Sequence, residues 1–106
     1  ELVAMFDVLE HIPDLSFLAA LQTRYLAVAV PYCRWRELGA DGDAWFRSWP
    51  MRLPNEHLHH FDRESLVALL AHSGFECVTL NCFEDGIRLR PGEAGPNILS
   101  GFFRKS

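Results

Sequence analysis

The sequence predicts an α/β fold of about four strands, two of them parallel and the last two an antiparallel pair, with two main helices. Three observations support this. Two short apolar runs, residues 2–8 and 25–30, flank a segment that can turn as a helix. A well-capped helical pattern covers residues 61–75. A loop rich in Gly and Pro, with no helical pattern, separates the last two apolar stretches.

Residues 2–8 are almost continuously apolar, which is typical of a strand buried on both faces of a parallel sheet. Pro13 or Asp14 should open a short helix, because proline fits a first helical turn. Residues 25–30 form the second buried strand, which Pro31 ends. A helix between two buried strands predicts a right-handed crossover and a parallel pair.

Residues 31–60 show no sustained period, although residues 43–49 are compatible with a short helix. Helix 61–75 is signalled at both ends: Asp62 is a good N-cap, Phe61 and Leu66 can form a hydrophobic staple, and Gly74 suits the left-handed residue after the end. Residues 76–83 and 97–104 are then expected as antiparallel strands joined by the breaker-rich loop 90–96.

The composition fits one globular domain at most, or a piece of one, at 106 residues with 49% hydrophobic side chains. A net charge of −4 gives no basic footprint for nucleic acid, and no apolar run approaches a membrane span. Three cysteines match no zinc or redox spacing, so we expect reduced thiols and a cytoplasmic protein. The chain begins with Glu and lacks a signal-like leader, so we expect an internal fragment or a processed chain.

Five stretches, taken in order, carry a family resemblance. They are Phe-Asp-Val-Leu-Glu-His-Ile-Pro-Asp at 6–14, Val-Ala-Val-Pro at 28–31, and the stretches 57–66, 70–76 and 96–105. Together they resemble the carboxyl-terminal half of a class I S-adenosylmethionine-dependent methyltransferase, in the broad branch of the ubiquinone-pathway O-methyltransferases. The resemblance implies a partial Rossmann-like sheet holding the family's fourth to seventh strands. It makes residues 1–106 a single partial domain and residues 31–60 a long substrate-side loop.

The family binds S-adenosylmethionine mainly through a glycine-rich turn after its first strand and an acidic residue after its second, and neither occurs in this sequence. The resemblance therefore implies methyl transfer to a small-molecule acceptor in a full-length parent, with this chain supplying the methionine-end wall and the substrate loop. Two alternatives stay open. The chain is an inactive truncated remnant, or it is an interaction module that forms a homodimer through the bare edge of its first strand.

The resemblance assigns Phe6, Asp7, Val8 and His11 to the methionine end of the cofactor, where a carboxylate suits a sulfonium cation. The alternative is that Glu10 and His11 only orient the following helix. Some ubiquinone-pathway relatives hold a divalent ion with an acid, an acid and a histidine at the D-x-x-E-H spacing of Asp7, Glu10 and His11. Three ligands on one turn are a weak signal, and we expect no bound metal.

The H-x-H-H spacing of His57, His59 and His60 can be interpreted as a set of metal ligands. The resemblance instead places His57 near the substrate pocket, where an imidazole can act as general base. The alternative is a loop histidine that packs against the strand ends, while His59 and His60 are expected to have no functional role. Tyr32, Trp35 and Trp49 are expected to contact the substrate. For the loop aromatics, a lid over a planar substrate and a small secondary core are equally supported.

Overall fold

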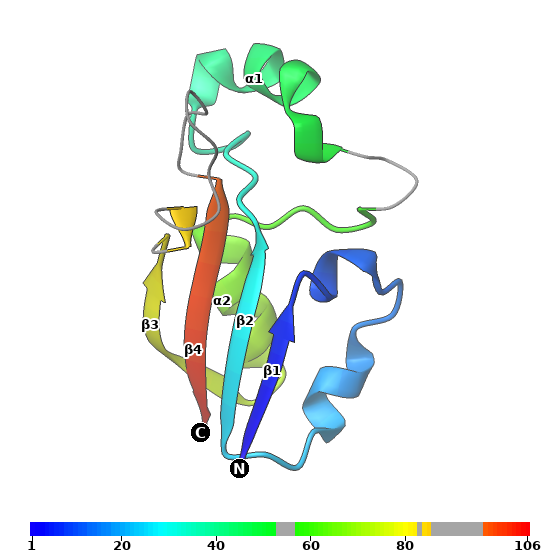
Figure 1. Cartoon of the computed structure of the whole chain (residues 1–106), viewed down its shortest axis with the longest axis vertical. Helices are drawn as coiled ribbons and strands as arrows, with labels where there is room; N and C mark the ends of the chain where they lie inside the picture. The colour runs from blue at the N-terminus through cyan, green and yellow to red at the C-terminus, as the bar shows by residue number, and fades with distance from the viewer. Residues whose placement is uncertain (53–56, 83, 86–96) are drawn as a thin grey trace.

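The structure is a computed structural model that describes residues 1–52, 57–82, 84–85 and 97–106, and it contains one mixed sheet with strand order β1-β2-β4-β3. The sheet confirms the predicted α/β class (Figure 1). Its strands are β1 (Leu2–Phe6), β2 (Tyr25–Pro31), β3 (Phe75–Asn81) and β4 (Ile98–Lys105).

The pairing of β1 with β2 is parallel, as predicted, with a register that runs from Leu2 opposite Tyr25 to Phe6 opposite Ala29. The connection differs from the expected helix, because it contains two 3-10 helices, η1 (Leu9–His11) and η2 (Ser16–Ala20). Pro13 lies between these two turns and has no N–H to donate to a continuous helix. Short 3-10 turns are common as connectors between elements.

The two remaining pairings are antiparallel, β4 lying between β2 and β3. The predicted antiparallel carboxyl-terminal pair is therefore confirmed, with a register shift between Cys77 and Thr79. The breaker-rich loop expected at 90–96 lies outside the described residues.

Two α-helices accompany the sheet: α1 (Gly42–Ser48) and α2 (Arg63–His72). Helix α2 begins as predicted, with a reciprocal capping box in which Ser65 N donates to Asp62 Oδ1 at 2.8 Å and Asp62 N donates to Ser65 Oγ at 3.0 Å. It is followed by Gly74 at a φ of +92°, the left-handed conformation expected there.

The hydrophobic core lies between α2 and one face of the sheet, and Figure 1 shows α2 running behind the strands. Its fully buried members include Leu26 and Phe103 from neighbouring strands and Leu66 and Leu70 from α2. Neighbouring strands contribute alternate residues to this face, which is why the core is continuous across the sheet.

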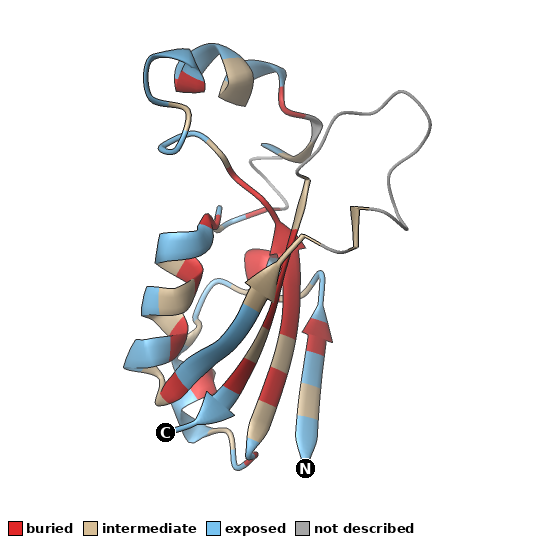
Figure 2. Cartoon of the chain, turned by 90° about the vertical axis from the view of Figure 1, so that its left-hand side faces the viewer, coloured by how far each residue is buried: buried red, intermediate tan, exposed pale blue. Residues whose placement is uncertain are grey.

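The expectation that residues 2–8 are buried on both faces is wrong. Leu2 and Phe6 are 57% and 54% exposed, whereas Met5, on the other face of β1, is buried. Figure 2 shows the difference between this outer strand and the largely buried β2 and β4. The physical reason is position: β1 is an edge strand, and only the face that carries Met5 packs into the core cluster.

All three cysteines are free thiols, with Cys33 buried, Cys82 half-buried and Cys77 exposed. Among the described residues, no helix combines the length and the apolar character needed to cross a bilayer.

The Asp62 cap should be a measurable part of the stability. Burial opposes its charge, yet hydrogen bonds from Ser65 N and the Arg36 guanidinium outweigh burial and lower the pKa of the carboxyl group. We expect Asp62→Ala to lower the free energy of unfolding by about 1–2 kcal/mol at neutral pH. A lowered folded-state pKa gives stability that is lost as pH falls, so the deficit should shrink toward pH 3.

Urea denaturation at both pH values measures this effect. Asp62→Asn is the matched control, because it retains a capping side chain and should lose less. Equal losses for the Ala and Asn variants would contradict the capping role.

Candidate functional site

The carboxyl ends of β1 and β2 meet at one edge of the sheet, as their parallel pairing requires. Figure 1 shows helix α1 beyond this edge, while both chain termini lie at the opposite end. Immediately after β1, Asp7 adopts a left-handed φ of +61°, and its N–H donates to the Ala29 carbonyl at 2.9 Å. This conformation is uncommon for a residue other than glycine, although Asp and Asn adopt it more readily than most, and unusual backbone conformations are concentrated at functional sites.

The four residues expected at the cofactor surround this strained turn. Phe6 and Asp7 are exposed, Val8 is half-buried, and the His11 side chain is 43% exposed. They therefore present a partly apolar, partly charged surface at the edge where open α/β sheets bind ligands.

A backbone clamp joins this turn to a distant segment. The Glu10 carbonyl accepts hydrogen bonds from Leu58 N at 2.7 Å and from His59 N at 3.3 Å. The His59 ring reaches further along the same turn, with Nε2 2.8 Å from the Ile12 carbonyl oxygen. His59 thus has a structural contact, and its neighbour His57 is fixed beside the end of β1.

The buried His57 ring lies against His11, with ring centroids 4.7 Å apart in an edge-to-face arrangement. Its Nδ1 is 2.7 Å from the Met51 carbonyl oxygen, which can only accept, so Nδ1 carries the proton. In the neutral ring, Nε2 is then the nitrogen with a lone pair, the form that a general base or a metal ligand needs.

Glu10 is the residue that sequence reasoning undervalued. It is 1% exposed, and its Oε1 has no hydrogen-bond partner among the residues that the structure describes. Its Oε2 lies 3.7 Å from His11 Nε2. Burial raises the pKa of this carboxyl group, and the nearby Asp7 charge adds to the effect. The residue's own backbone N–H, His11 and His57 oppose it. A glutamate between Leu9 and His11 gives no sequence signal of burial, because the 3-10 turn decides which side chains point inward.

Within the described part of the chain, Glu10, His11 and His57 form a group capable of holding a metal ion, with one ligand atom from each lying within 4.8 Å of the others. This group differs from the D-x-x-E-H set that the resemblance implies, because His57 takes the place of Asp7.

Tyr32 is buried at the end of β2 and its hydroxyl is already engaged. It donates to Glu37 Oε1 and accepts from Arg63 Nε at 3.1 Å. Burial and the hydrogen bond to Glu37 raise the pKa of this phenol. The structure thus places Tyr32 in a polar network of its own, apart from the His11–His57 pair.

The loop aromatics gather into one cluster. Trp35 stacks on Phe46 at 5.0 Å, and Trp45 stacks on Trp49 at 4.9 Å. His60, expected to have no role, lies 5.4 Å from Phe46 and 5.6 Å from Trp49 between ring centroids. Trp49 is buried, and its Nε1 has no hydrogen-bond partner among the described residues, whereas Trp35 is 47% exposed and donates to Asp43 Oδ1 at 2.7 Å.

A hollow of about 280 Å³ opens beside this cluster, past the end of β2. Its apolar wall includes Cys33 and Trp35, and its polar wall includes Arg36, which binds Asp62 through two hydrogen bonds of 2.7 and 2.8 Å. The size suits a small planar molecule or part of a larger one.

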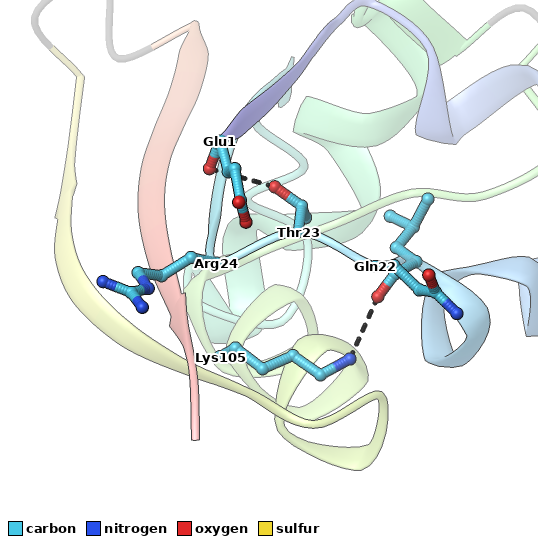
Figure 3. Close-up of a pocket in the computed structure, with 6 residues that line it drawn as sticks. Glu1, Gln22, Thr23, Arg24 and Lys105 are labelled. Carbon is cyan, nitrogen blue, oxygen red and sulfur yellow. Dashed lines mark hydrogen bonds between the residues drawn. The ribbon is translucent and has the colours of Figure 1, made fainter.

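A larger hollow, of about 600 Å³, lies at the opposite end of the sheet (Figure 3). Thr23 Oγ1 lies 3.1 Å from the Glu1 carbonyl, and Lys105 Nζ donates to the Leu21 carbonyl at 3.0 Å. This hollow is at the amino ends of the parallel strands, away from the edge where such sheets bind ligands, and it contains none of the predicted site residues.

Residues 1–80 match the model of a family described as methyltransferase domain. The chain belongs to the methyltransferase domain family. The matched part of this methyltransferase-family chain contains β1, β2 and both α-helices, together with every residue predicted at the site. No curated protein and no solved structure matches the chain.

Because Glu10 is buried, replacing it should change the stability of the protein by an amount that depends on pH. A raised pKa in the folded state means that the folded protein binds this proton more tightly than the unfolded chain does. Stability therefore falls as the pH rises through the pKa of the unfolded chain and then through that of the folded protein. In the presence of a chelator, Glu10→Gln should therefore raise the melting temperature at pH 7–8 relative to the parent protein, and the gain should shrink toward pH 4. A pH-independent difference would contradict this account.

The left-handed backbone at Asp7 predicts which of two variants is more stable. Asp7→Gly and Asp7→Ala both remove the side chain, so their difference isolates the backbone. We expect Asp7→Gly to be the more stable by about 1 kcal/mol in urea denaturation, because glycine adopts positive φ without strain. Equal stability of the two variants would contradict strain at this position.

Proposed function

We propose that this chain forms the methionine-end wall and the acceptor loop of an S-adenosylmethionine-dependent methyltransferase site that acts on a small molecule. The observation that carries the proposal is the clamp at the Glu10 carbonyl, which joins the turn after β1 to the segment that carries His57. Membership of the methyltransferase domain family supplies the reaction class.

Phe6, Asp7, Val8 and His11 are proposed to contact the cofactor. Their support is position and chemistry: all four lie at or just after the end of β1, Asp7 is exposed there, and a carboxylate suits a cationic sulfonium. Methyl transfer in line from sulfur to a nucleophile needs mainly positioning, which rigid strand ends provide.

His57 is proposed as the catalytic residue that accepts a proton from the methyl acceptor. Its tautomer supports this role, since Met51 holds the proton on Nδ1 and leaves the lone pair on Nε2. A neutral imidazole with that lone pair can remove the proton of a hydroxyl or carboxyl group as the methyl group arrives.

Trp35, Trp49 and Tyr32 are proposed on the acceptor side. The two tryptophans belong to the aromatic cluster next to the 280 Å³ hollow, and the stacked faces favour a planar acceptor. Tyr32 would act through its network with Glu37 and Arg63, which holds the end of β2.

The decisive experiment is an NMR titration of the protein with S-adenosylmethionine and with S-adenosylhomocysteine, which lacks the positive charge. We expect binding on the order of millimolar, since the glycine-rich turn is not in this sequence. Amide shifts should centre on residues 6–11, with S-adenosylmethionine favoured. Asp7→Asn should remove that preference, because it removes the carboxylate charge and tolerates the left-handed backbone.

Asp14→Asn is the matched control, an exposed acid outside the turn after β1, and it should leave the preference unchanged. Shifts centred on the hollow of Figure 3, or no shifts at millimolar ligand, would overturn the proposal.

A second candidate function is supported by the edge strand. In the described part of the chain no strand pairs with the outer side of β1, which also exposes Leu2 and Phe6. Such an edge can add a strand from another chain, and a homodimer through β1 is the simplest product. Light scattering across a concentration series would detect the dimer, and Ala4→Pro should abolish it, whereas a monomer at every concentration would exclude it.

A further inference from the structure

We propose that the hollow of about 280 Å³ beyond the end of β2 binds an uncharged planar ring, such as a phenol, and discriminates against rings that carry a carboxylate or phosphate group. Naming this ring as the methyl acceptor rests on the proposed function, whereas the binding preference itself does not. The hollow is lined by six residues: Cys33, Trp35, Arg36, His60, Asp62 and Ser65.

The arginine of the hollow is already neutralised. Arg36 Nε donates to Asp62 Oδ2 at 2.8 Å and Arg36 Nη2 donates to Asp62 Oδ1 at 2.7 Å, which is the forked geometry with which an arginine binds a ligand carboxylate. The Asp62 side chain is 7% exposed, so the fork is held from inside the fold. Glu64 lies 3.9 Å from the same guanidinium and adds negative charge. An anionic ligand therefore meets two carboxylates instead of a free guanidinium.

The amino end of α2, which would otherwise attract an anion, is occupied by the same side chain. Helix amino ends bind anions because their first N–H groups lack partners within the helix. Here Ser65 N, in the first turn of α2, donates to Asp62 Oδ1 at 2.8 Å. The negative charge of the N-cap thus stands where the charge of a ligand anion would bind.

The remaining wall of the hollow adds no positive charge. Cys33 is buried, and burial raises the pKa of its thiol, so the thiol stays protonated at neutral pH. Partial burial lowers the pKa of His60, and the two histidines that precede it lower it further, so this imidazole is uncharged at neutral pH. Because Arg36 and Asp62 cancel, the six lining residues carry no net charge.

A fixed tryptophan supplies the attraction for a planar ligand. Trp35 stacks on Phe46 with ring centroids 5.0 Å apart, and its Nε1 donates to Asp43 Oδ1 at 2.7 Å. It also packs so closely on Gly42 that a Cβ there would lie 2.2 Å from the Trp35 carbonyl oxygen. The side chain is nevertheless 47% exposed. A ring held by three contacts can stack on a ligand with little further loss of side-chain freedom.

The hollow lies near the proposed base. Cys33 N donates to the Phe61 carbonyl at 2.8 Å, which joins the end of β2 to the segment that carries both histidines of interest. His60 lines the hollow and His57 lies against His11, and three residues of chain span at most about 11 Å. A ring bound in the hollow is therefore next to the turn after β1. Rejection of carboxylates narrows the proposed acceptor to a hydroxyl compound.

The test is an NMR titration of the protein, at neutral pH and without cofactor, with two probes of equal size: para-hydroxybenzamide, which is uncharged, and para-hydroxybenzoate, which carries a carboxylate. We expect the amide probe to bind on the order of millimolar, as its few atoms allow, with shifts centred on Cys33, Trp35 and Ser65. The benzoate should bind at least tenfold more weakly. Benzoate binding as tight as that of the amide, amide shifts centred elsewhere, or no binding of the amide at millimolar concentration would overturn the proposal.

Asp62→Asn tests whether the charge of Asp62 sets the preference. The new amide still caps α2, but it withdraws the negative charge and leaves the Arg36 fork able to bind a carboxylate. We expect the variant to bind para-hydroxybenzoate at least tenfold more tightly than the parent protein does, and Asp14→Asn, an exposed acid elsewhere, to change nothing. Unchanged benzoate binding in an Asp62→Asn protein with a parent-like NMR spectrum would contradict the charge account. The two probes test the preference on the parent protein alone, so the proposal does not depend on this variant folding.

Failure of this proposal is distinguishable from failure of the proposed function. Binding of the amide probe in the hollow without any binding of S-adenosylmethionine would overturn the methyl-transfer site and leave the ring site. Binding of S-adenosylmethionine at residues 6–11 without binding of the amide probe would overturn the ring site and leave the cofactor contacts.

Discussion

One carbonyl oxygen holds the candidate site together. The Glu10 carbonyl accepts from Leu58 N and His59 N, and these two bonds fix the chain before α2 against the turn that follows β1. Backbone bonds of this kind do not depend on side-chain identity, so the contact is set by the path of the chain. Together with the His59 ring at the Ile12 carbonyl, these bonds hold the segment that carries His57 beside His11.

The carboxyl edge of the sheet also holds two features that cost stability. Asp7 occupies a left-handed conformation, and Glu10 buries a carboxylate oxygen without a hydrogen-bond donor in the described part of the chain. These features lie within four residues of each other, whereas α2 is capped at both ends and packs into the core. Local rules are obeyed where the structure only has to be stable, and they are broken where ligands are expected, which is the usual distribution in functional proteins.

The sequence predicted the elements whose signals are local. The Asp62 cap, the Gly74 stop and the parallel pairing of two apolar runs all appear in the structure. It failed on properties that depend on neighbours. Apolar content alone did not distinguish an edge strand from a central one, so the exposure of Leu2 and Phe6 was missed. Nor did the helical spacing after Pro13 distinguish an α-helix from the observed 3-10 turns.

The sequence predicted which histidines lie at the site better than it predicted how they are arranged. His57 and His11 were singled out for different roles, and only the folded path shows their rings 4.7 Å apart. Burial of Glu10 follows from the short turn η1, whose inward residues are Leu9 and Glu10. No spacing rule covers a three-residue turn, so this carboxylate became visible only with the fold.

The position of Glu10 also bears on the proposed role of His57. One ligand-type atom each of Glu10, His11 and His57 lies within 4.8 Å of the others, so a charge on the buried carboxyl group acts on both rings. Burial raises the pKa of Glu10, while its own backbone N–H and the two histidines oppose that shift. A residue that need not touch the methyl acceptor therefore lies close enough to His57 to influence it electrostatically.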